Sequence, residues 1–308
     1  MATIVQRTDG RRQSMRTRSR SDRVIALAML APALILLGIF VIWPLLNAWQ
    51  VSFYRWSFYE ESVFVGLDNF RIVLTDPKFF DSVLRGLFFA VLVVPAQMVI
   101  AFAFASLTKT MGRRMATVLK VSIFVPTTIS FVIAAIVFTI IYQLRRGILN
   151  WGVGFLGVDD QAWIGNAQTA LYAISVPAIW IGLGIASLIM LASMLDIPES
   201  YYEAAELDGA NWFQQTWYIT LPMLKNIVLY LSIVGYVATL QQVDLPLVMT
   251  NGGPVDSTLL PNLLLFNHFR NDTYVGYSIA GALVMLVVLG SISTVIFRLL
   301  PSEKAVDS

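Results

Sequence analysis

The residue types needed for covalent catalysis or metal binding are almost absent from the chain. Among its 308 residues there is no cysteine and a single histidine, His268. This composition excludes thiol catalysis, disulfides, iron–sulfur clusters and zinc sites built from several Cys or His ligands. A membrane-embedded hydrolase would need a paired nucleophile and base, and neither HExxH nor GxSxG occurs in the chain. We therefore expect no catalytic residue and no metal, and a surface or packing role for His268.

Polar side chains stand near the end of one apolar segment. Gln241, Gln242 and Asp244 follow one another closely, and Tyr236 lies just before them. Polar residues at membrane depth are candidates for function. We therefore predict that Gln241, Gln242, Asp244 and Tyr236 line a solute pathway. The alternative is that they bond neighbouring helices or face water at the end of the segment.

Other polar residues lie within apolar segments. Gln97 is a further pathway candidate because of its depth in such a segment. Thr127, Thr128 and Ser130 follow Pro126, and we expect their hydroxyls to bond the preceding helical carbonyls rather than to face a pathway.

The segment 196–222, which we call the acidic loop, carries five carboxylates and no Lys or Arg. Its carboxylates are Asp196, Glu199, Glu203, Glu206 and Asp208. Pro198 suits the first turn of a helix and Asp208-Gly209 suits its end, so the segment predicts a short helix, a turn and a second helix over 210–219. Helices that bind anionic lipid are usually rich in Lys and Arg, which favours a protein partner here. From these features alone, a merely amphipathic helix at the membrane interface is an equal alternative.

The elements that must position these residues are long apolar helices. Hydrophobic residues make up 57% of the chain and charged residues 13%, against about 45–50% and about 25% in soluble domains. Because a membrane span needs about 20 apolar residues, we predict an all-α polytopic membrane protein with six transmembrane helices. Their approximate bounds are 24–46, 83–107, 118–141, 169–195, 222–246 and 276–299.

The distribution of Lys and Arg predicts the topology. Residues 1–23 carry seven arginines and little apolar surface, so we expect a basic N-terminal tail followed by a retained span rather than a cleaved signal peptide. With this tail inside, 14 of the 21 Lys and Arg residues fall on the cytoplasmic side. The positive-inside rule then places both termini and the acidic loop in the cytoplasm. The domains are thus the tail 1–23, the transmembrane domain 24–299 and the tail 300–308.

Two motifs resemble those of a known family. Glu203-Ala204-Ala205 is followed by Asp208-Gly209-Ala210 and, further on, by Ile219, Leu221 and Pro222. This spacing resembles the EAA loop of ABC-importer permeases. The segment Asn251-Gly252-Gly253-Pro254 resembles the one after the fifth span in carbohydrate-type permeases, such as those of maltose or glycerol-phosphate importers.

The resemblance implies a six-helix bundle of the type I ABC importer class in the plasma (inner) membrane. It implies three kinds of partner besides membrane lipid: a second permease subunit, a cytosolic ATPase dimer and an extracytoplasmic solute-binding protein. Glu203, Ala204, Ala205, Asp208, Gly209 and Ala210 would dock and couple the ATPase. Asn251, Gly252, Gly253 and Pro254 would form a turn at the outer gate. The solute would be a sugar or a sugar-like molecule.

The chain holds no G-x4-GK[ST] phosphate loop, so we expect no cofactor on it and expect ATP-Mg on the partner ATPase. Gly182 and Gly184 have neither the spacing nor the lysine, and we expect them to permit close helix packing. The small net charge of +2 gives no support to nucleic-acid binding. Two alternatives remain open: an ABC permease of a peptide or amino-acid branch, and an ion-coupled secondary transporter.

Overall fold

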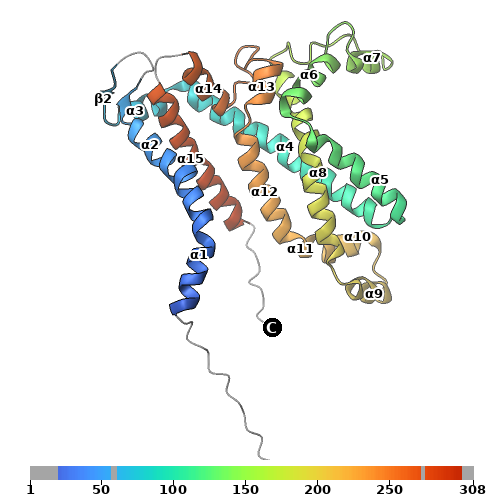
Figure 1. The fold of residues 1–308 in the computed structure, drawn as a ribbon. Coiled ribbons are helices and arrows are strands. Elements are labelled where there is room, and N and C mark those ends of the chain that lie inside the picture. The colour runs from blue at the N-terminus through green and yellow to red at the C-terminus, as the bar shows by residue number, and fades with distance from the viewer. Residues whose placement is uncertain (1–19, 57–60, 272–274, 300–308) are drawn as a thin grey trace, which may run out of the picture. The chain divides into compact units, whose positions relative to one another are not determined.

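The computed structural model describes residues 20–56, 61–271 and 275–299 (Figure 1). The tail predicted at 300–308 lies outside the described residues, and so does the basic tail 1–23 except for its last four residues. The chain separates into two compact units, one that ends at Gln50 and one that begins at Val51.

The N-terminal unit is a long helix whose described side chains are nearly all exposed. It comprises α1 (Arg20–Leu37), the π-helical turn η1 (Gly38–Ile42) and α2 (Trp43–Val51). Residues Ile25–Val51 are long and apolar enough to cross a membrane, and their most apolar stretch is 0% buried. Such a helix suits a lipid environment, as expected for the first predicted span. It begins at Arg20, four residues before the predicted start of that span.

The second unit is built around four long helices. These are α4 (Pro77–Lys109), α8 (Ala170–Leu195), α12 (Lys225–Leu240) and α15 (Val275–Leu299). Before them, β1 (Tyr54–Arg55) pairs antiparallel with β2 (Val63–Phe64), and α3 (Asp68–Thr75) follows. Between them lie α5 (Arg113–Phe124), the 3₁₀ turn η2 (Val125–Thr128), α6 (Phe131–Ile141) and α7 (Ile148–Gly154). The later short elements are α9 (Glu199–Leu207), α10 (Trp212–Gln215), the π-helical turn η3 (Thr216–Thr220), α11 (Leu221–Met223), α13 (Asp244–Met249) and α14 (Pro261–Asn271).

Five of the six predicted spans are helices that could cross a membrane in the described part of the chain. The span predicted at 118–141 is different, because α5–η2 and α6 meet at an angle of 100°. Ile129 and Ser130 are extended there, and the Ser130 hydroxyl caps α6 by accepting from the Val132 N–H at 3.3 Å. The pair counts as a sixth span only as a broken one.

The predicted local role of the two threonines at this bend is confirmed. The Thr127 hydroxyl donates to the Phe124 carbonyl at 2.6 Å, and the Thr128 hydroxyl donates to the Val125 carbonyl at 2.8 Å. Each hydroxyl thus bonds the carbonyl three residues earlier, within the helical turn itself.

Several short helices of the second unit lie at the two ends of its long helices. Figure 1 shows α9, α10 and α11 at one end, beside the C-terminus of α8, and α7, α13 and α14 at the opposite end. The acidic loop and the Asn251–Pro254 turn therefore lie at opposite ends of the long helices.

Helix α8 forms the centre of the unit. Half of its apolar stretch is buried, more than in any other candidate span of the described residues. Pro177 lies within α8 and has no N–H to donate to the Ala173 carbonyl one turn earlier. The buried Tyr142 hydroxyl donates to that carbonyl instead, at 3.0 Å. A side chain from the end of α6 thus satisfies the backbone group that the proline leaves free.

We predict that Tyr142→Phe lowers the free energy of unfolding by about 1–3 kcal/mol, the usual cost of a buried polar group without a partner. The loss should be smaller in a Pro177→Ala background, where a backbone N–H at position 177 can bond the Ala173 carbonyl. Thermal unfolding of the four proteins of this cycle measures the difference. Equal losses in the two backgrounds would contradict the assigned role of Tyr142.

Candidate functional site

The acidic loop folds as two short helical pieces whose ends are closed by local hydrogen bonds. Helix α9 starts after Pro198, and α10 starts two residues later than the predicted second helix. Asn211 and Gln214 form a reciprocal cap: the Gln214 N–H donates to Asn211 Oδ1 at 3.0 Å, and the Asn211 N–H donates to Gln214 Oε1 at 2.8 Å. Such capping boxes fix the start of a helix.

The turn between these helices depends on Gly209, whose φ is +80°. The Gly209 N–H donates to the Glu206 carbonyl at 3.0 Å, and the Ala210 N–H donates to the Ala205 carbonyl at 2.8 Å. These two bonds are the Schellman motif that ends helices at a left-handed residue. A Cβ at position 209 would meet nothing within 4 Å, so conformation alone, not space, favours glycine here.

This corner presents carboxylates around an exposed apolar side chain. Glu203, Glu206 and Asp208 are exposed, and Ala205 and Ala210 are half-buried against the turn. Leu207 is 90% exposed at the tip. Sequence reasoning passed over Leu207, although an apolar residue beside a helix-ending Asp-Gly pair is a detectable signal. A rigid corner with an apolar tip and an acidic border suits a groove with a basic rim on another protein.

Tyr202 attaches the acidic loop to the rest of the unit. Its hydroxyl lies 3.0 Å from the Thr220 hydroxyl, and the Lys109 ammonium lies 4.0 Å from the centre of its ring. Lys109 ends α4, and Thr220 is buried. Tyr202 thus links α9 to both α4 and the entry to α12 through one hydrogen bond and one cation–π contact.

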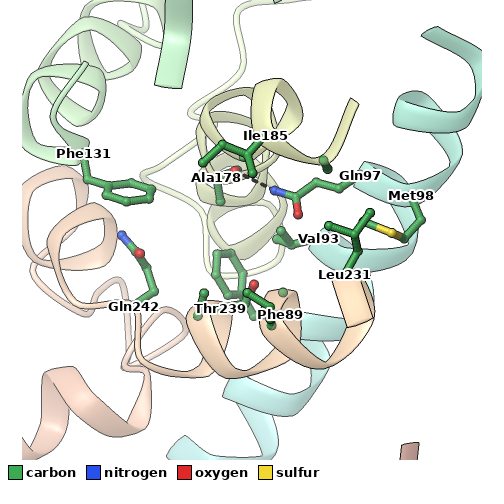
Figure 2. A pocket seen from close by; sticks show the side chains of 15 residues that line it. Phe89, Val93, Gln97, Met98, Phe131, Ala178, Ile185, Leu231, Thr239 and Gln242 are labelled. Carbon is green, nitrogen blue, oxygen red and sulfur yellow. Dashed lines mark hydrogen bonds between the residues drawn. The ribbon is translucent and has the colours of Figure 1, made fainter. Parts of the chain in front are cut away.

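A cavity of about 200 Å³ lies among α4, α8 and α12 and is open on one side, where the exposed Ile185 and Val234 line it (Figure 2). Most of its wall is aliphatic, with two aromatic rings, Phe89 and Phe131. Its polar side chains are Gln97 from α4, Thr239 from α12 and Gln242 from the break that follows α12. Distant parts of the chain therefore place two amides on one cavity.

Gln97 is held by the backbone of α8. Its Nε2 donates to the Ala178 carbonyl at 3.1 Å and approaches the Ile179 carbonyl at 3.5 Å. A Cβ at Gly182 would lie 2.1 Å from that Nε2, so glycine makes the approach possible. At Gly184 a Cβ would lie 2.7 Å from the Ile123 carbonyl oxygen. The expected role of Gly182 and Gly184 in close helix packing is confirmed.

Gln242 is the predicted pathway residue that lines the cavity. Its side chain is only 9% exposed, and its buried Nε2 has no hydrogen-bond partner in the described structure. A buried amide N–H without a partner is uncommon and calls for an explanation. Figure 2 shows this amide directed toward the space beside Phe131.

The other three predicted pathway residues do not line this cavity. Gln241 is exposed, and its backbone carbonyl accepts from Asn262 Nδ2 at 3.3 Å. Asp244 is exposed in the first turn of α13, and Tyr236 is half-buried on α12. The chain turns between α12 and α13, so side chains that are neighbours in sequence diverge.

The Asn251–Pro254 segment forms a closely bonded turn at the end opposite the acidic loop. Asn251 and Gly252 have positive φ values of 50° and 85°. The buried Thr258 hydroxyl lies 2.6 Å from the Thr250 hydroxyl and donates to the Gly253 carbonyl at 2.9 Å. These bonds hold the turn in shape through Thr250 and Thr258, which flank it in the sequence.

Residues 63–303 match the family described as the binding-protein-dependent transport system inner membrane component. The trehalose/maltose transport system permease protein MalF of Thermococcus litoralis is 30% identical over 264 residues, which cover 85% of this chain and 88% of that protein. The sulfoquinovosyl glycerol transport system permease protein SmoG of Agrobacterium fabrum is 28% identical, and the match covers 92% of each chain.

Solved structures share the fold. A chain in the crystal structure of a bacterial ABC transporter involved in import of the acidic polysaccharide alginate has a TM-score of 0.72 and 20% identity, covering 91% of this chain and 96% of that chain. A chain of a bacterial alginate ABC transporter in complex with an alginate pentasaccharide-bound periplasmic protein has a TM-score of 0.72 and 19% identity. The motif geometry, the fold and the match over residues 63–303 lead to one assignment: the chain belongs to the binding-protein-dependent transport system inner membrane component family.

Proposed function

We propose that this chain is one permease subunit of an ATP-driven importer for a sugar or sugar-like solute. The observation that carries the proposal is the exposed corner at Gly209, where the EAA-type residues are arranged by a Schellman turn around the tip Leu207. The relatives named above include permeases of trehalose/maltose and sulfoquinovosyl glycerol transport systems. They favour the sugar branch over a peptide or amino-acid branch and over an ion-coupled secondary transporter.

In this proposal the acidic loop faces the cytoplasm and docks an ATPase dimer. Glu203 would pair with a basic residue of the ATPase, while Ala204 and Ala205 would allow close approach. ATP-Mg would bind to the ATPase, since this chain has no phosphate-binding loop. Asp208, Gly209 and Ala210 would hold the corner that the ATPase moves. Both termini would lie on the same cytoplasmic side, as the Lys and Arg distribution indicates.

Movement of the corner would reach the transmembrane helices through Tyr202. Because Tyr202 contacts Lys109 at the end of α4 and Thr220 before α12, a displacement of α9 would act on two of the helices that line the cavity. A second permease subunit would complete the pathway, and an extracytoplasmic binding protein would deliver the solute. The turn Asn251–Pro254 would stand at the outer gate.

Gln242 would contact the solute in the cavity, because a solute hydroxyl would supply the partner that its Nε2 lacks. Gln241, Asp244 and Tyr236 are close to Gln242 in the sequence, but they do not line this cavity. If they contact solute, they do so elsewhere along the pathway.

The first test is purification of the chain from its native membrane, followed by identification of co-purifying proteins and an ATPase assay. We expect a P-loop ATPase and a second permease subunit to accompany it. If the chain purifies alone in several detergents and no ATPase associates, the proposal fails and the ion-coupled secondary transporter becomes the better hypothesis.

A second test concerns Gly209. Gly209→Val should reduce the co-purified ATPase about tenfold, because a left-handed backbone costs about 1–2 kcal/mol per non-glycine residue and more for a β-branched one. Membrane insertion should be unchanged, since a Cβ there meets nothing within 4 Å.

Gly209→Asn is the matched control, because asparagine tolerates the left-handed conformation. It should retain most of the ATPase. Undiminished ATPase association and solute-dependent hydrolysis in Gly209→Val would contradict the coupling role of the corner.

A further inference from the structure

We infer that the cavity among α4, α8 and α12 accepts a neutral, hydroxyl-bearing sugar ring and discriminates against a sugar acid. Gln97 and Gln242 would supply one acceptor and one donor for its hydroxyls. This inference rests on the proposed function and names the class of solute that the same pathway would take.

The wall of the cavity contains no ionisable side chain among its described residues. Beyond Gln97, Thr239 and Gln242, the wall is aliphatic or aromatic apart from glycine. A carboxylate or sulfonate moved into such a space would lose part of its hydration and gain no opposite charge from the wall, which makes its transfer unfavourable. A neutral ring loses far less, and its hydroxyls can hydrogen-bond the amides.

Asp244 does not alter this charge balance. Its carboxylate is exposed in the first turn of α13 and lies outside the cavity wall. Arg85 and Lys109, both on α4, are also outside the wall. Arg85 pairs at 3.8 Å with Asp81, and Lys109 lies over the ring of Tyr202. The charges of α4 are therefore engaged away from the cavity.

The two amides can take opposite roles toward a hydroxyl group: Gln97 would accept a hydrogen bond and Gln242 would donate one. The Gln97 NH₂ group faces the Ala178 and Ile179 carbonyls of α8, so its Oε1 must point the other way, and Figure 2 shows that oxygen on the cavity side. Gln242 is 9% exposed with an unpartnered Nε2. A solute hydroxyl can donate to Gln97 Oε1 and accept from Gln242 Nε2.

Aromatic rings add a surface that fits a sugar but not a free anion. Phe89 and Phe131 both line the cavity, and the ring that a solute can reach is that of the partly exposed Phe131, since Phe89 is 0% exposed. The apolar C–H face of a pyranose packs against such rings, while its hydroxyls project from the edge toward the amides. Together, these features describe a site for a neutral ring of pyranose size.

The test uses two probes that differ only at one carbon: methyl α-glucopyranoside and its uronic acid, methyl α-glucopyranosiduronate. Binding is measured by saturation-transfer difference NMR, which detects weak ligands. The full chain, with the subunits that accompany it, is placed in lipid nanodiscs so that no glycoside detergent competes.

We expect the glucoside to give a signal at least about fivefold stronger than the uronate. Gln242→Leu and Gln97→Leu should each weaken the glucoside signal about fivefold, the factor that corresponds to one lost hydrogen bond. Gln168→Leu is the matched control, because Gln168 is exposed, outside the cavity wall and not among the pathway residues, and its signal should equal that of the wild type.

A variant that gains binding of the uronate cannot be explained by misfolding, so it complements the variants that lose binding. Gln242→Lys places a positive charge in the cavity and should make the uronate signal equal to or stronger than the glucoside signal. Equal signals from both probes in the wild type, no signal from either, or an unchanged preference in Gln242→Lys would each overturn the inference. Association of the ATPase does not involve the cavity, so failure of the proposed function would appear in the co-purification test and not here.

Discussion

The close contact between α4 and α8 is the constraint on which the second unit depends. Within a membrane, backbone carbonyls that lose their helical partner must find another donor inside the protein. Pro177 creates such a carbonyl at Ala173, and Tyr142 supplies the donor. Gly182 gives Gln97 room to reach further carbonyls of α8. These contacts hold α4 and α6 against α8, and the space left toward α12 is the cavity.

The charged and the uncharged polar side chains discussed above occupy different parts of the unit, according to their exposure to water. The carboxylates exposed on the acidic loop and the Lys78–Asp256 pair, at 4.0 Å, stand at opposite ends of the long helices. The cavity among α4, α8 and α12 has amides and a hydroxyl instead of charges. Because burial of an unpaired charge costs far more than burial of an amide, this arrangement keeps a hydrogen-bonding site in the apolar bundle. In the inference above, it would also limit the kind of solute that the site accepts.

The corner of the acidic loop differs from the bundle because its shape is fixed by residues close in sequence. The Schellman bonds at Gly209 and the reciprocal cap at Asn211 and Gln214 need no distant partner. Tyr202 also contacts Lys109 outside the loop, and Ile197, Tyr202 and Ile219 pack with core residues of α4, α8 and α12. A corner shaped by local bonds, in a loop that also packs on the long helices, suits a role as a docking point joined to the bundle.

The sequence by itself determined the apolar helices, since hydropathy and length suffice to identify segments that can cross a membrane. It also determined the helix–turn–helix of the acidic loop and the local bonds of Thr127 and Thr128, because these depend on neighbouring residues. The sharp bend after η2 and the groups that share the cavity were decided only by tertiary structure. Gln97 and Gln242 are distant in the chain and line one cavity because α4 and α12 pack together. Asp244, two residues from Gln242, turns away because the chain breaks between α12 and α13, and sequence spacing places side chains on a common face only where a helix is regular.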